Sequence, residues 1–263
     1  MCLQSSTMSE HIEITPEIIE IRHYLHAHPE RSFKEYETSA YIEKLLRAHD
    51  IEVLNNPLET GVVGLIRGDQ PGPRIALRAD IDALPVHEHN TVDYKSDVEG
   101  KMHACGHDGH MAILLGAAKM LMSMKDRIEG DVYLAFQPAE ETGAGAPDFI
   151  KFGDWYDKVG AIFGGHVWID LPAGLVSVEE GPRMAASSQI TINVKGKQGH
   201  GAQPHQAVDA IVVASAIVMN LQTVVSRNVS ALDSLVLTIG NIHSGSEWNV
   251  IPGEAKMGGT IRF

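Results

Sequence analysis

Residues 103–136 read HACGHDGHMAILLGAAKMLMSMKDRIEGDVYLAF and combine, in that order, a polar loop, a helix and a strand. The apolar run from Asp108 to about Met124 predicts the helix. Asp131–Phe136 predicts a strand, which Pro138 ends. Helices that alternate with strands are typical of an α/β fold.

The same alternation extends on both sides of this stretch. Thr15-Pro16-Glu17 is a helix start, with a capping hydroxyl, a proline and an acid in that order. We expect further helices over residues 35–48 and 149–155, and strands over residues 51–54, 62–66, 75–77 and 161–163. This pattern predicts a doubly wound, mainly parallel sheet, although a closed barrel would give a similar alternation.

The pattern changes after Gly181-Pro182. Gln189–Val194 alternates polar and apolar residues, as a half-exposed antiparallel strand does. We expect a long helix over residues 207–222 and strands over residues 235–239 and 255–263. The sequence therefore predicts a metal-binding catalytic domain over residues 1–183 and a smaller α+β domain over residues 184–263.

Composition excludes several classes of protein. The net charge is −13, which disfavours binding to nucleic acid. No window of about 18 uninterrupted apolar residues occurs, so we predict no membrane span. Met1–His11 lacks the pattern of a secretory signal. The two cysteines are too few for a disulfide framework, and they fit a reducing cytoplasm.

Cys105 and His107 form the most informative pair. They lie two residues apart, so in an extended loop they face the same side. Thiolate and imidazole groups are ligands of zinc, and the start of a helix favours an anionic thiolate. A structural cysteine in a histidine-rich loop is the alternative.

Three further polar clusters follow predicted strands. Glu140 and Glu141 follow residues 131–136, His166 follows residues 161–163, and Arg78–Asp82 follows residues 75–77. Each alone is more often a solvated turn than a site. We place all four clusters where strands end, which is where open α/β sheets bind ligands. A metal site with a carboxylate as general base explains them together.

The chain resembles the N-acyl-amino-acid amidohydrolase branch of the aminoacylase and carboxypeptidase-G type metallopeptidases. This branch includes hippurate hydrolases, auxin-conjugate hydrolases and N-acetyldiaminopimelate deacetylases. The segments that carry the resemblance are RHYLHAHPE (22–30), ALRADIDALP (76–85), HACGHDGH (103–110), QPAEE (137–141), GH (165–166), GHGAQPH (199–205) and NVIP (249–252).

The resemblance implies a catalytic domain with an inserted lid, through which two copies form a homodimer. It implies two divalent ions, zinc or manganese, bridged by Cys105. His107, Glu141 and His166 would be terminal ligands, and Glu140 the general acid/base. The wider superfamily has a metal-binding histidine at the position of Arg78. In this branch His107 takes that role, so neither Arg78 nor Asp80 is assigned as a ligand.

Residues of the smaller domain also match. His200 resembles the lid histidine that reaches across the dimer to stabilise an oxyanion. Asn249 and Arg262 resemble residues that hold the carboxylate of the substrate, which suits an arginine fork. A plain strand-surface arginine is the alternative for Arg262. Supporting roles are implied for His205, Asp108 and His110.

Family members continue beyond a Gly-Thr-Ile-Arg-Phe segment and supply one more histidine ligand. We therefore expect a C-terminally truncated chain, whose last strand lacks partners. The expected function is metal-dependent hydrolysis of the amide bond of N-acyl amino acids. The alternative is a catalytically impaired metal-binding or dimerisation fragment. A phosphoryl-transfer enzyme is disfavoured because no Gly-x4-Gly-Lys-Ser/Thr loop occurs.

Overall fold

The computed structural model describes residues 16–178, 180–181 and 184–263, and the chain divides into two units. The first unit is Met1–Leu175 and the second is Val176–Phe263. The leader Met1–His11 and the capping Thr15 lie outside the described residues. The predicted boundary between residues 183 and 184 borders residues that are not described, and it stays a prediction.

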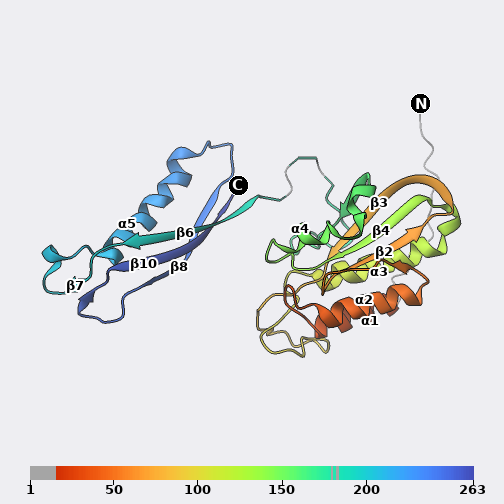
Figure 1. Ribbon diagram of the computed structural model, residues 1–263, viewed down its shortest axis with the longest axis horizontal. Coiled ribbons are helices and arrows are strands. Elements are labelled where there is room, and N and C mark those ends of the chain that lie inside the picture. The colour runs from red at the N-terminus through yellow and green to blue at the C-terminus, as the bar shows by residue number, and fades with distance from the viewer. Residues whose placement is uncertain (1–15, 179, 182–183) are drawn as a thin grey trace. The chain divides into compact units, whose positions relative to one another are not determined.

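The first unit is built on an open sheet of five strands in the order β1-β2-β4-β3-β5 (Figure 1). The strands are β1 (Glu52–Val53), β2 (Val62–Arg67), β3 (Gln70–Asp80), β4 (Glu129–Gln137) and β5 (Ala161–Gly164). β3 pairs in parallel with β4 and β5, whereas β2 is antiparallel to β1 and β4. All strands but β2 therefore run the same way. The sheet is mostly parallel, as predicted, and it is not a closed barrel.

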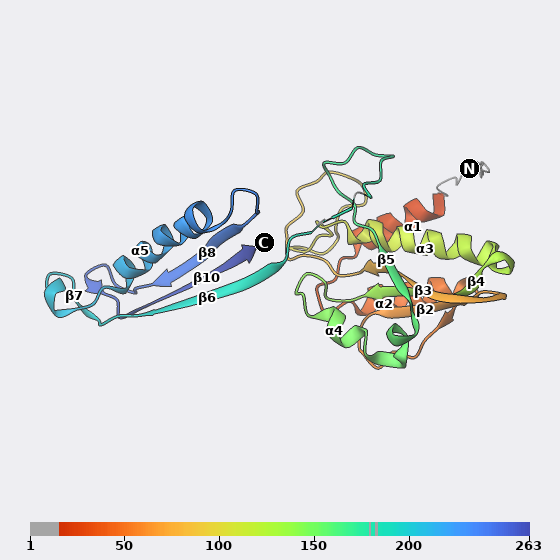
Figure 2. The ribbon, with the colours of Figure 1, turned by 90° about the horizontal axis from the view of Figure 1, so that it is seen from above.

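Helices cover both faces of this sheet (Figure 2). One face packs against α1 (Pro16–Ala27), α2 (Tyr36–Ala48) and α3 (His107–Ser123). The other face packs against α4 (Gly145–Phe149) and the 3-10 turns Phe152–Asp154 and Tyr156–Lys158. The helix predicted over residues 149–155 is wrong in its bounds, because Gly153 adopts a φ of 67° that no α-helix accepts.

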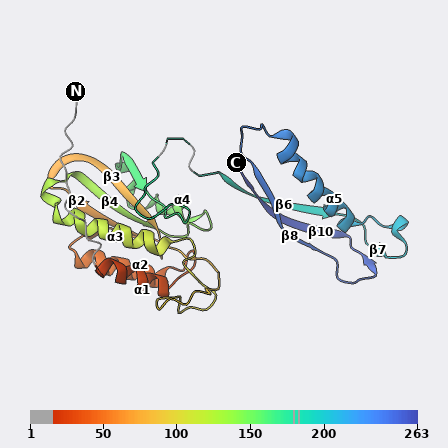
Figure 3. The same cartoon turned by 180° about the vertical axis from the view of Figure 1, so that it is seen from behind.

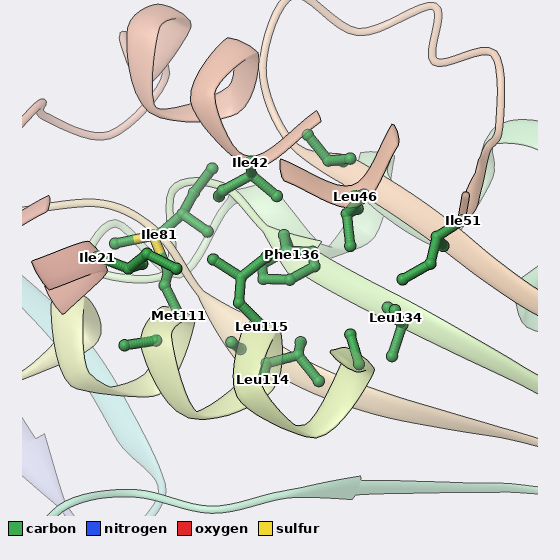
Figure 4. Close-up of a cluster of buried hydrophobic side chains, with 14 of the residues drawn as sticks. Ile21, Ile42, Leu46, Ile51, Ile81, Met111, Leu114, Leu115, Leu134 and Phe136 are labelled. Atoms are coloured by element: carbon green, nitrogen blue, oxygen red, sulfur yellow. The ribbon is translucent and has the colours of Figure 1, made fainter. Parts of the chain in front are cut away.

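The core explains why the central strands read as continuous apolar runs. Val132, Leu134 and Phe136 of β4 face the three long helices (Figure 4). Tyr133 and Ala135 point to the opposite face, where they pack with aromatic side chains of the α4 region. Because both faces are buried, both sets of alternating side chains must be apolar.

The connections place several loops at one edge of the sheet. The chain runs from β3 through α3 to β4, and from β4 through α4 to β5. Because β4 and β5 lie on opposite sides of β3, right-handed connections put α3 and α4 on opposite faces. The carboxyl ends of β3, β4 and β5 therefore lie together.

The second unit is an α+β unit (Figure 3). Its antiparallel sheet has the order β6-β10-β8, and α5 (Ala210–Thr223) packs on it. The strands are β6 (Ser187–Lys195), β8 (Val236–Ser244) and β10 (Glu254–Arg262), with a separate ladder of β7 (Gly199–His200) and β9 (Val250–Ile251). β10 is central and pairs along its length with β6 and β8. The expectation that the last strand lacks partners is therefore wrong.

Helix α5 begins three residues later than predicted because Asp209 caps it. The Asp209 carboxylate accepts hydrogen bonds from the backbone N–H groups of Ile211 and Val212. The helical stretch Ala210–Asn228 is long and apolar enough to cross a membrane, with a mean hydropathy of 1.5. Its Ala210 and Ala214 are buried against the sheet, as in an ordinary α+β layer.

We expect Phe136→Ala to lower the free energy of unfolding by about 3–5 kcal/mol, because the substitution empties a fully buried site. Phe163→Ala is the matched control, since the Phe163 side chain is 66% exposed. It should change stability by about 0.5 kcal/mol or less. Denaturant unfolding followed by circular dichroism measures both, and equal losses would contradict the assigned core.

Candidate metal centre

The carboxyl ends of three parallel strands carry most of the polar side chains of the candidate site. Asp82 follows β3, Glu140 and Glu141 follow β4, and His166 follows β5. The Cys105 segment differs from the expectation that all four clusters follow strands. It lies at the start of α3, after a long loop, and it reaches the same edge because α3 begins there.

His107 is the centre of the cluster. Its side chain is fully buried, and Nδ1 donates a hydrogen bond to the backbone oxygen of Asp82 at 2.8 Å. This bond leaves Nε2 facing the acids. Nε2 lies 3.5 Å from Oδ2 of Asp80, 3.8 Å from Oε1 of Glu141 and 3.9 Å from Oε2 of Glu140. Neither His107 Nε2 nor Glu141 Oε1 has a hydrogen-bond partner, although both atoms are buried.

Cys105 and His166 complete the arrangement. Cys105 Sγ lies 3.5 Å from His166 Nε2, and His166 Nδ1 donates to the backbone oxygen of Val167. One ligand atom each from Cys105, His107 and His166 lies within 4.8 Å of the others. The same holds for His107, Glu140 and Glu141. All five candidate residues of this unit therefore come together around His107.

Gly106 allows the loop of Cys105 to lie close to the loop that carries His166. It has a φ of 86°, and a Cβ atom built on it would lie 2.4 Å from Cγ2 of Val167. Both the backbone conformation and the space therefore favour glycine. Because Gly106 separates Cys105 from His107, it lets their loop pack against the loop that carries His166.

The electrostatics of the cluster favour a cation. Burial and the nearby carboxylates of Glu141, Glu140 and Asp80 raise the pKa of the Cys105 thiol to about 12. Burial also raises the pKa of Glu141. A divalent cation reverses both effects, because it stabilises the thiolate and the carboxylate together. The unpartnered Nε2 and Oε1 atoms and the mixed sulfur, nitrogen and oxygen donors fit a zinc-type ion.

Asp80 forms hydrogen bonds with residues that surround the cluster. Its carboxylate accepts from Nη1 of Arg78 at 2.7 Å and from Nδ1 of His110 at 2.6 Å. Burial alone would raise the pKa of Asp80, but these contacts and the charge of His107 lower it well below its usual range. His110 Nε2 in turn accepts from the Val167 N–H at 2.9 Å. Asp80 thus reaches the His166 loop through His110, while Arg78 also donates to Gln137.

Asp108 belongs to a different network. Its buried carboxylate accepts from Arg22 Nε and pairs with His26 Nδ1, each at 2.8 Å. The hydrogen bond from His26 to the Asp108 carboxylate, opposed by burial, raises the pKa of His26. These contacts tie α1 to the first turn of α3, so Asp108 anchors the helix that begins with His107.

Two buried acids near the site were missed or left unassigned from the sequence. Asp82 is 1% exposed and accepts from the Ser32 hydroxyl and from the Glu141 N–H. Asp80 is the last residue of β3 and Asp82 follows two residues later; this spacing was a usable signal, since alternate residues face one side. Glu35 is fully buried and accepts from the Ala139 N–H. Its position at a helix start gave no such signal.

The structure brings only some of the second unit's candidates together. His200 and Asn249 meet at the β7–β9 ladder, where His200 pairs with Val250. His200 Nδ1 accepts from the Ala202 N–H at 3.0 Å, which leaves the ring proton on Nε2. Arg262 is exposed at the far end of β10, eight residues along from Glu254. At about 3.3 Å per residue, the strand separates its ends by roughly 25 Å.

Comparisons with known proteins agree with this combination of an α/β sheet and a candidate metal centre. Residues 76–256 match the model of peptidase family M20/M25/M40. The chain is 47% identical over 246 residues to N-acetyl-L-cysteine deacetylase of Bacillus subtilis, covering 94% of this chain and 59% of that protein. It is 42% identical to an N-acyl-L-amino acid amidohydrolase of Geobacillus stearothermophilus, covering 95% of this chain and 68% of that protein.

A solved structure is also similar. It is a dinuclear metal-binding peptidase of family M20 from Bacillus subtilis, 42% identical, with a TM-score of 0.77. The match covers 94% of this chain and 64% of that one. The chain therefore belongs to peptidase family M20/M25/M40, in agreement with the resemblance seen in the sequence. It spans about three fifths to two thirds of the length of these relatives.

We expect the metal-free Cys105 thiol to react slowly with iodoacetamide at pH 8, because a pKa of about 12 leaves roughly one thiol in ten thousand ionised. Glu141→Gln removes a neighbouring negative charge and should speed the reaction. A Cys2→Ser background leaves one cysteine to follow by mass spectrometry. Glu43→Gln, on the surface of α2, is the control. Equal rates in all variants would contradict the charge assignment.

Proposed function

We propose that this chain forms the metal-binding part of an amidohydrolase that cleaves the amide bond of N-acyl amino acids. The observation that carries the proposal is a pair of buried ligand atoms without hydrogen-bond partners, His107 Nε2 and Glu141 Oε1, which face each other beside Cys105 and His166. The relatives named as a deacetylase and an amidohydrolase support N-acetyl and similar N-acyl amino acids as the substrate class.

We assign two divalent ions, zinc or manganese, to this centre. Cys105 would bridge them, and His107, Glu141 and His166 would be terminal ligands. The dinuclear relative and the donor set support this assignment. When bound, the ions supply Lewis acidity, which polarises the acyl carbonyl and acidifies the attacking water.

Glu140 acts as the general acid/base in this proposal. Its side chain is 43% exposed, twice as much as that of Glu141, and its Oε2 lies 3.9 Å from His107 Nε2. It thus borders the ligands while remaining open to substrate. The carboxylate takes a proton from the attacking water and delivers it to the leaving amine nitrogen, as amide cleavage requires.

We assign the first unit as a doubly wound catalytic domain and the second as its lid. His200 stabilises the oxyanion by donating its Nε2 proton, and Asn249 and Arg262 hold the carboxylate of the substrate. Asn249 lies five residues before the start of β10 and Arg262 is the last residue of β10, so one copy of the lid does not bring both to one carboxylate. Two copies can supply one residue each, which supports a homodimer.

The exposed side of α5 supports the same assembly. Val212 and Met219 are 62% and 70% exposed, although both are apolar. Burial of such a face in a homodimer removes it from water. We also assign the protein to the cytoplasm, since Cys105 is a free thiol and a reducing compartment preserves it. The net charge of −13 argues against nucleic acid as a partner.

The direct test is an assay with N-acetylated amino acids and hippurate, in the presence of added Zn²⁺ or Mn²⁺. Release of the free amino acid would support the proposal. Metal binding without turnover of any of these substrates would favour the alternative, a catalytically impaired metal-binding or dimerisation fragment.

In the active, metal-loaded protein, we expect Glu140→Ala to lower kcat by about 10²–10⁴-fold, because the proton carrier is lost. Metal content, measured by atomic absorption, should not change. Glu141→Ala is the comparison variant and should lose both metal and turnover. If Glu140→Ala also empties the site, the ligand and the base have been assigned to the wrong residues.

We expect Val212→Asp to shift the protein from dimer to monomer, because it places a charge in the apolar face of α5. Sedimentation velocity measures the change. Ile113→Asp on α3 is a matched control, since Ile113 is also 62% exposed, and this variant should remain dimeric. A dimer in both variants would place the interface elsewhere.

A further inference from the structure

Glu35 is a buried carboxylate that the proposed chemistry does not use. It lies immediately before α2, where side chains often cap the helix, but its side chain makes no capping hydrogen bond. Instead, Oε1 accepts from the backbone N–H of Ala139 at 2.8 Å, across 104 positions of the sequence. Glu35 is 0% exposed, and its Oε2 has no hydrogen-bond partner.

The residue that Glu35 holds has an unusual backbone conformation. Ala139 has a φ of 53°, in the left-handed region that residues with a Cβ rarely adopt. Ala139 is itself fully buried and directly precedes Glu140 and Glu141. A strained residue persists only where its surroundings fix it. The Glu35 hydrogen bond is one such constraint.

A second carboxylate holds the same loop two residues later. Oδ2 of Asp82 accepts from the Glu141 N–H at 3.0 Å. Alternate N–H groups of the loop, at residues 139 and 141, are therefore fixed by acids from two other segments. Glu140 lies between them and is the more exposed of the two glutamates.

We propose that Glu35 is a positioning residue that keeps Ala139 in its left-handed conformation and thereby sets where Glu140 and Glu141 point. The role in turnover rests on the proposed amidohydrolase function, whereas the role in loop conformation does not. Burial, which raises the pKa of Glu35, is consistent with a group whose purpose is a hydrogen bond to the backbone rather than a surface charge.

The first experiment follows hydrogen exchange at the amides of residues 139–141 in the metal-free protein, by mass spectrometry. Glu35→Ala should speed exchange there by at least tenfold, whereas Glu35→Gln, which keeps an oxygen acceptor, should change it by less than threefold. Glu30→Ala is the matched control. Glu30 Oε2 also accepts a backbone N–H at 2.8 Å, but that N–H belongs to Thr38 of α2.

The second experiment measures turnover of N-acetyl amino acids by the active, metal-loaded protein. Glu35→Ala should lower kcat by about tenfold or more, with KM within about threefold of the parent value. Adding Ala139→Gly to the Glu35→Ala variant should recover at least half of the loss in log kcat, because glycine adopts a positive φ without strain. A general packing defect would not respond to this change.

The outcomes distinguish the positioning role of Glu35 from the proposed amidohydrolase function. If the parent protein hydrolyses none of these substrates, the proposed function fails, and hydrogen exchange alone decides the role of Glu35. Unchanged exchange at residues 139–141 in Glu35→Ala overturns the inference, and so does a loss of kcat that Ala139→Gly does not relieve. If Glu35→Ala does not fold, the isosteric Glu35→Gln decides instead. Because this variant still has an acceptor oxygen, exchange at residues 139–141 as fast as in an unstructured loop would overturn the inference.

Discussion

The hydrogen bond from His107 Nδ1 to the backbone oxygen of Asp82 is the contact on which the rest of the site depends. It fixes the ring at the start of α3 against the end of β3, and it turns Nε2 toward the acids that follow β4. A ligand that must meet others within a few ångströms needs such outer support, because a free side chain samples several rotamers. The parallel strands supply the support, since their carboxyl ends meet at one edge.

The surroundings of the site repeat this principle with carboxylates. Asp80 holds His110, Asp82 holds the Glu141 N–H, Glu35 holds the Ala139 N–H, and Asp108 holds Arg22 and His26. Each is at most 1% exposed. Buried acids are costly unless they are paired or hydrogen-bonded. Four such acids around one site are expected if rigid placement of the metal ligands matters more than the stability of the metal-free protein.

Much of this arrangement could be predicted from the sequence, for physical reasons. The buried strand 131–136 and the apolar helix after Asp108 carry periodic patterns that local physics fixes. Cys105, His107 and the paired glutamates stand next to them. Glu35 could not be found in this way, because a glutamate at the start of a helix usually faces solvent. Its role depends on a contact 104 residues away. The helix predicted over residues 149–155 failed for a local reason, the positive φ of Gly153.

Gly106 carries a consequence for sequence variation. Alanine, the smallest alternative, would meet Val167 with its methyl group and would also have to adopt a φ of 86°. Either the Val167 side chain would have to rotate away or the two loops would have to separate, and the positive φ would be strained in both cases. Every residue other than glycine carries a Cβ atom and meets the same strain, so we expect this position to vary less than the exposed positions of α3.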